Sequence, residues 1–162
     1  MIVICKHNAG LENLPGTFAG LMDLYERNYI GIRRLIPAMP RAGTAWLSQA
    51  PDSIDLHLRV IERFRYTTEL SLTYHFQKDH KLIAEPDLHI RIYHDARQAE
   101  VLSARLRHRP YFSSCFDGYT EGARIDLRAR WHVNRFLYKW LNYCLHQKHC
   151  FVDSHKQVAN LD

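Results

Sequence analysis

The stretch 54–93 reads IDLHLRVIERFRYTTELSLTYHFQKDHKLIAEPDLHIRIY, and apolar residues occupy alternate positions in three separate runs of it. The runs are centred on Leu58, Leu72 and Ile90. Because successive side chains of a strand point to opposite faces of a sheet, each run predicts a strand with one buried face. No helical pattern separates the runs, so they predict an antiparallel meander.

Helical periodicity precedes and follows this predicted meander. After Thr17, a candidate N-cap, apolar residues recur every three or four positions as far as Ile36, and two prolines then end the pattern. From Asp126, a second candidate N-cap, to His146 a broad apolar stripe predicts a long helix packed on the sheet. The predicted fold class is α+β, with an N-terminal helix, three to four antiparallel strands and a long C-terminal helix.

The other segments set the limits of one domain. We read residues 1–16 as a flexible extension, 17–147 as a single α+β domain and 148–162 as a polar tail. Within the domain, 98–106 fit either a fourth strand or a short helix, and 108–122 fit a packed loop. The predicted core contains Leu58, Leu72, Ile90, Ile92, Phe136, Leu137, Trp140 and Leu141.

Composition places the chain among ordinary globular proteins. An apolar fraction of 46% and a charged fraction of 24% over 162 residues exclude a disordered or fibrous chain and suit one domain. Apolar runs are far shorter than the roughly 20 residues that cross a bilayer, and the N-terminus lacks a secretory pattern. The four cysteines lack CxxC spacing. We therefore expect a cytoplasmic protein with free thiols and no membrane span.

The excess of basic residues in the chain is compatible with an anionic partner. The formal net charge is +5, and every Lys or Arg position between Arg91 and Arg130 is arginine. The planar fork of arginine matches phosphate and carboxylate groups in two places at once, which lysine does not. A net charge of this size also serves solubility alone, so the position of the arginines matters more than their number.

Two polar strings fall at predicted strand ends, where a meander brings neighbouring chains together. Paired arginines in these strings fit an oxyanion, and a histidine beside an aspartate fits an acid–base pair. A structural ion-pair network uses the same residue types. The candidate ligand-binding residues are Glu62, Arg65, Tyr66, Arg91, Tyr93, His94, Asp95 and Glu100.

Three functions follow from these residues. We prefer a small non-enzymatic binding or regulatory module in which the region of Arg65, Arg91 and His94 receives an anionic group of a ligand or protein partner. A hydrolase or transferase that uses His94 and Asp95, supported by Glu62 or Glu100, is the second interpretation, and the sequence does not assign the catalytic residues. RNA or single-stranded nucleic-acid binding on a sheet face with His89, Arg91 and Tyr93 is the third.

A histidine–cysteine cluster follows the second predicted helix. His146, His149 and Cys150 stand at helical spacing that is compatible with zinc. However, Cys144 falls on the apolar stripe, and the helix dipole favours histidines near a helix C-terminus. We therefore expect no bound metal and no cofactor.

The same strings resemble the YqiB-like family, a family of uncharacterised bacterial proteins. The resemblance rests on Arg65-Tyr66-Thr67-Thr68, on Tyr93-His94-Asp95-Ala96, on Asn28 with the string at 33–37, and on Asn134, Phe136-Leu137, Trp140-Leu141 and Cys144-Leu145. It covers about residues 20–147, and His132 stands where the family pattern has a glutamine. The resemblance implies a bacterial, cytoplasmic protein and assigns no activity.

Overall fold

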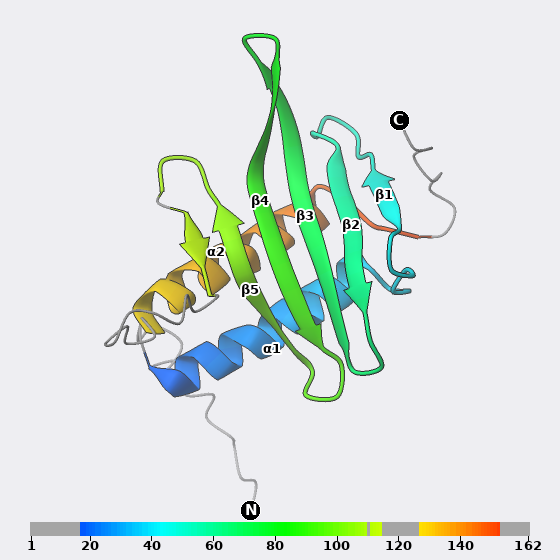
Figure 1. Ribbon diagram of the computed structural model, residues 1–162. Helices are drawn as coiled ribbons and strands as arrows, with labels where there is room; N and C mark the ends of the chain where they lie inside the picture. The colour runs from blue at the N-terminus through cyan, green and yellow to red at the C-terminus, as the bar shows by residue number, and fades with distance from the viewer. Residues whose placement is uncertain (1–16, 110, 115–126, 153–162) are drawn as a thin grey trace, which may run out of the picture.

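A helix opens the described chain. Figure 1 shows the computed structural model, which describes residues 17–109, 111–114 and 127–152. Helix α1 (Phe18–Leu35) begins after Thr17, whose hydroxyl accepts a hydrogen bond from the amide of Gly20 at 3.2 Å, so the predicted N-cap is confirmed. The helix ends at Leu35, two residues before Pro37, which lacks the amide a further turn requires.

The strands form one antiparallel sheet in which each strand pairs with the next one along the chain. In the described residues the strands are β1 (Ala45–Ser48), β2 (Leu56–Arg63), β3 (Thr67–Lys78), β4 (Lys81–Tyr93), β5 (Gln98–Arg105) and β6 (Phe112–Ser113). Asp79 and His80 join β3 to β4, and both have positive φ, as a type I′ hairpin turn requires. The three predicted strands are β2, β3 and β4.

The predicted count of three to four strands is wrong, because the described residues contain six. The ambiguous segment 98–106 contains β5, so it is a strand rather than a helix. Strands β1 and β6 escaped prediction because they have four and two residues, too few to show an alternating pattern. Residues 110 and 115–122 of the predicted loop lie outside the described part of the chain.

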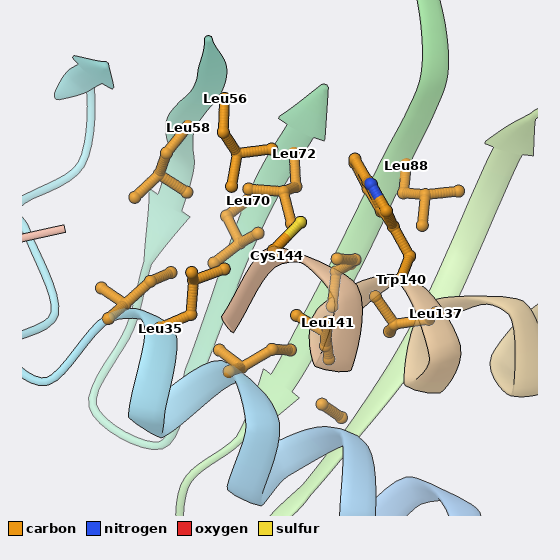
Figure 2. Packing of buried hydrophobic residues seen from close by; sticks show 14 of the residues in the cluster. Leu35, Leu56, Leu58, Leu70, Leu72, Leu88, Leu137, Trp140, Leu141 and Cys144 are labelled. Carbon is orange, nitrogen blue, oxygen red and sulfur yellow. The ribbon is translucent and has the colours of Figure 1, made fainter. Parts of the chain in front are cut away.

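Both helices cover one face of the sheet (Figure 1). Helix α2 (Leu127–His146) has the predicted extent, and its candidate N-cap, Asp126, lies outside the described residues. Leucines of β2, β3 and β4 meet Leu137, Trp140 and Leu141 between the layers (Figure 2). All residues of the predicted core are buried except Phe136, which is half-buried at its margin.

The two helices approach each other closely and share a buried polar contact. A side chain at Gly31 would place its Cβ 3.1 Å from Leu141 Cδ1, so glycine permits the approach. Nearby, Asn28 Nδ2 donates to the backbone oxygen of Asn134 at 3.2 Å. The side-chain oxygen of Asn134 accepts from the amide of Val101 at 3.0 Å, which ties both helices to β5.

The chain reverses after α2 and returns to the core. Lys148 has φ 67°, and the amide of His149 donates to the carbonyl of Cys144 at 3.0 Å, as in a Schellman cap. His149 is buried between the hydroxyls of Ser48 and Ser53, each 3.1 Å from a ring nitrogen. Phe151 is completely buried. The prediction of a polar tail from residue 148 is therefore wrong for His149 and Phe151.

The burial of His149 makes the stability depend on pH. Burial lowers the pKa of His149 below its ordinary value, so the unfolded chain takes up the proton more readily than the folded one. The folded state therefore has its full stability with respect to His149 above the unfolded pKa of about 6.5. The free energy of unfolding falls as the pH drops below that value. We expect urea unfolding to show a larger loss of unfolding free energy between pH 7.5 and pH 5.5 in the natural protein than in His149→Gln. Equal losses would contradict this assignment.

The described residues contain two of the four cysteines, Cys144 and Cys150, and both are free thiols. Cys144 is buried against Tyr74, and burial raises the pKa of its thiol to about 11. No helix in the described part of the chain is long and apolar enough to cross a membrane.

Candidate anion-binding pocket

A pocket of about 540 Å³ lies between the C-terminal end of α1 and the hairpin that joins β2 to β3. The strand ends and the loop after α1 position its walls. Four basic side chains line it, namely Arg33, Arg63, Arg65 and His94, and no acidic residue among the described ones does so. Pro37, Ala38, Met39 and Phe64 complete the lining. The pocket is therefore electropositive.

Two of the arginines are held in place by neutral acceptors. Arg63 Nη1 donates to the backbone oxygens of Met39 at 2.8 Å and Pro40 at 3.1 Å. Arg33 Nη2 donates to the backbone oxygen of Pro37 at 3.0 Å. Because carbonyl groups carry no net charge, these bonds orient the guanidinium groups without neutralising them. Two fixed positive charges thus remain available to an anion.

Arg65 stands at the exposed tip of the hairpin. Its guanidinium carbon lies 5.1 Å from the ring centroid of Tyr66, a cation–π distance. The turn between β2 and β3 is closed by a hydrogen bond from the amide of Phe64 to the carbonyl of Thr67 at 2.8 Å. No ion pair involving Arg65 occurs among the described residues, so its fork is open to a ligand.

His94 lies at the end of β4, on the side of the sheet that faces α1. Its Nε2 lies 2.8 Å from the hydroxyl of the buried Thr68, and its amide donates to the carbonyl of Tyr66 at 2.8 Å. Burial, and then the charges of Arg33 and Arg63, lower the pKa of His94, against the opposing charge of Asp95. A bound anion would reverse part of this shift and favour the protonated ring.

Arg91 takes part in a different cluster, on the face of the sheet that the helices do not cover. Its Nε donates to Glu69 Oε1 at 2.8 Å, and His89 Nε2 lies 2.9 Å from the other oxygen of the same carboxylate. Burial alone would raise the pKa of Glu69, but the bonds and charges of Arg91 and His89 outweigh it and lower the pKa. The fork of Arg91 is therefore already occupied.

Tyr93 and Glu100 extend this cluster to the neighbouring strand. The hydroxyl of Tyr93 donates to Glu100 Oε1 at 2.7 Å. The other oxygen of Glu100 accepts hydrogen bonds from Tyr25 of α1 at 3.2 Å and from Arg130 of α2 at 3.4 Å. Burial, and then the charge of Glu100, raises the pKa of Tyr25 to about 12. These residues tie the sheet to both helices.

The eight candidate residues therefore do not converge on one site. Arg65 and His94 line the pocket. Tyr66 and Asp95, the residues that follow them in the sequence, are exposed. Arg91 is bound to Glu69 on the open face, and Tyr93 is bound to Glu100, which also contacts both helices. Glu62 is exposed on β2 opposite Glu69. The predicted convergence of Glu62, Arg65, Arg91, His94 and Asp95 is wrong. Side chains alternate between the two faces along a strand, so Arg91 and His94, three positions apart, lie on opposite faces.

Two pocket residues were not among the candidates. Arg63 lies one residue after Glu62, and its position in the polar string was a usable signal. Arg33 comes from α1, thirty positions before Arg63, and only the packing of the helix end against the hairpin brings the two together. The sequence carried no sign of that contact.

The histidine–cysteine cluster has a structural explanation in the described residues. Both ring nitrogens of His149 are satisfied by serine hydroxyls, and Ser48 Oγ also accepts from the amide of Cys150 at 3.1 Å. No group of three or more His, Cys, Asp or Glu residues in the described part of the chain is arranged to hold a metal ion.

Comparison with known proteins gives a family without an assigned activity. The chain belongs to the family described as "Protein of unknown function (DUF1249)", whose model matches residues 31–150. The uncharacterised protein YqiB of Escherichia coli K12 is 30% identical over 131 residues, which cover 79% of this chain and 88% of YqiB. The YqiB proteins of strains O6:H1 and O157:H7 give the same values. No solved structure matches.

The resemblance to the YqiB-like family is thereby confirmed. All four basic residues of the pocket fall inside the segment that the family model matches.

Proposed function

We propose that this protein is a binding module that receives the anionic group of a small ligand or protein partner in the pocket of Arg33, Arg63, Arg65 and His94. The observation that supports the proposal is a concave lining with four basic side chains and no carboxylate among the described residues. Hydrogen bonds between charged groups are worth about 1.5–3 kcal/mol each, so two or three forks suffice for a specific complex.

The neutral anchors of the arginines support this role over a structural one. Arg91 donates to the carboxylate of Glu69, which neutralises its charge. Arg33 and Arg63 instead donate to backbone carbonyl groups at the rim of the pocket, so they keep their charge. Their orientation is fixed before a ligand arrives, so less conformational entropy is lost on binding. Phosphate and carboxylate groups both fit such forks.

The test uses two small probes, phenyl phosphate and benzoate, which share a ring and differ in the anion. We expect nuclear magnetic resonance titration to move the side-chain signals of Arg65 and His94, and Arg65→Ala to weaken binding about tenfold through loss of one charged hydrogen bond. Because Arg65 is exposed, this change should leave the melting temperature unaltered. Arg59→Ala, which removes an exposed cation of β2 outside the pocket, is the matched control. Undiminished binding by Arg65→Ala would refute the proposal.

Binding should also respond to pH through His94. Sulfate keeps its charge across the neutral range, so it serves as a probe that does not itself titrate there. A bound anion raises the pKa of His94, which means that binding takes up a proton. Sulfate should therefore bind more tightly at pH 5.5 than at pH 8, and His94→Gln should remove the difference.

Arg91→Ala separates the pocket from the cluster on the open face. It removes the partner of Glu69 at a partly exposed position, where the Arg91 side chain is 38% exposed. We expect a loss of about 1–2 kcal/mol in unfolding free energy with unchanged binding of phenyl phosphate. A loss of binding in this variant would place the site on the open face instead.

The geometry gives less support to the enzymatic interpretation than to the binding module. His94 shares its Nε2 with Thr68, and no hydrogen bond joins His94 to Asp95. On the open face, His89, Arg91 and Tyr93 are engaged by Glu69 and Glu100, so that surface offers nucleic acid fewer open donors. Both interpretations stay hypotheses behind the binding module.

A further inference from the structure

A second concave site lies where the β3–β4 hairpin extends past the rest of the sheet. The pairing of β2 with β3 reaches only Tyr74, and the pairing of β5 with β4 reaches only Asp87. Residues 75–86 therefore form a two-stranded extension, which Figure 1 shows projecting beyond its neighbours. Between this extension, the segment 106–109 and Phe136 of α2 lies a groove of about 740 Å³.

The groove has apolar walls from β3, β4, α2 and the segment after β5. Phe76 of β3, Ile83 of β4, Leu106 and Phe136 line it. Phe76 is 41% exposed although it lies in the middle of a strand pair, where it is paired with Ile83. Large apolar side chains left exposed together around a concave surface are typical of binding grooves.

The rim of the groove is basic. Lys78, Arg107, His108 and Arg109 line it against one acidic residue, Glu85. No ion pair within the described residues engages Lys78, Arg107 or Arg109. An occupant with negative charges would therefore gain ion pairs there, whereas a basic occupant would be repelled.

We propose that this groove docks an acidic segment of a partner protein that carries an exposed aromatic or aliphatic side chain. The apolar side chain enters between Phe76, Ile83 and Phe136, and flanking carboxylates meet Lys78 and Arg107. The part of β4 before Asp87 has no partner in β5, so an extended segment can also add backbone hydrogen bonds along that edge. The apolar walls favour a peptide over nucleic acid, whose phosphates need only the basic rim. This proposal is independent of the pocket at Arg65.

The experiment is selection from a display library of random short peptides on the full-length protein. We expect the selected peptides to combine Asp or Glu with Phe, Leu or Trp. For one synthetic peptide from the selection, Phe76→Ser and Arg107→Glu should each weaken binding at least about tenfold. Both residues are exposed, so circular dichroism should show an unchanged fold. The matched controls, Phe18→Ser and Arg59→Glu, change exposed residues that line neither concave site and should leave binding unaltered.

Four results would overturn the proposal. Selection of basic or uncharged peptides, or of none, would exclude the predicted chemistry. Peptide binding that survives both Phe76→Ser and Arg107→Glu would place the interaction elsewhere. Dimer formation in analytical ultracentrifugation that Phe76→Ser abolishes would identify a second copy of the chain as the occupant. Binding to vesicles of anionic lipid that the same two changes abolish would identify a membrane surface.

Discussion

Replacing Trp140 by Ala lowers the free energy of unfolding by about 3–5 kcal/mol, the range for a large aromatic side chain removed from a core. Trp140 is 6% exposed. Figure 2 shows its side chain between α2 and the sheet. Its ring meets Tyr74 edge-on with centroids 5.3 Å apart and lies 6.2 Å from Phe136. The change removes these contacts and leaves a cavity that a rigid sheet cannot close.

Urea unfolding followed by circular dichroism measures this loss without relying on tryptophan fluorescence. The midpoint should fall with an unchanged slope, which indicates lost stability rather than a changed unfolded state. Tyr143→Ala, at a 51% exposed position of the same helix, should cost less than about 1 kcal/mol. If Trp140→Ala is too unstable to purify, Trp140→Phe should give a smaller loss in the same direction. Equal effects at positions 140 and 143 would contradict the described packing.

Replacing Asn134 by Ala has the second largest expected effect, about 2–3 kcal/mol. The change leaves the amide of Val101 without its acceptor inside the core, and it removes the side chain that packs against Asn28. A buried donor without an acceptor costs about 1–3 kcal/mol, because it is hydrogen-bonded to water in the unfolded chain and to nothing in the folded one. Thermal unfolding detects a loss of this size readily.

The control for Asn134 lies on the exposed side of the same helix. Asn142→Ala removes an identical side chain from a solvated position, and alanine favours helices, so we expect no loss of stability there. Hydrogen exchange of the Val101 amide adds a local measurement. In Asn134→Ala this amide should exchange much faster, and an unchanged exchange rate would show that Asn134 does not hold β5.

The predicted elements that proved correct are those with long patterns. Helices α1 and α2 and strands β2, β3 and β4 each repeat their apolar period several times, so periodicity alone identified them. The return of the chain after α2 was hidden because Lys148 occupies the positive-φ position where glycine is the usual signal. His149 and Phe151 therefore looked like parts of a polar tail.

The candidate site was harder to predict, because it depends on register. Counted from the pair Lys78 and Lys81, a regular ladder would place Glu69 opposite Ile90. A bulge between Thr73 and His75 shifts the pairing by one residue, so Glu69 faces Arg91. Nothing in the residue pattern marks this bulge. The separation of Arg91 from His94, in contrast, follows from the alternation of side chains along β4 and was predictable.

The asparagine contact joins residues 106 positions apart, whereas each strand pairs with its neighbour in the chain. On the ribosome, each hairpin of the sheet can form soon after its two strands emerge, because the connections are short. The side of α1 that packs against Asn134 and Leu141 is synthesised before the sheet, but it gains its partner only when α2, which follows the sheet in the chain, has been translated. A nascent chain stalled before α2 thus exposes apolar surface on both α1 and the sheet, which is the kind of surface that chaperones recognise and that aggregates.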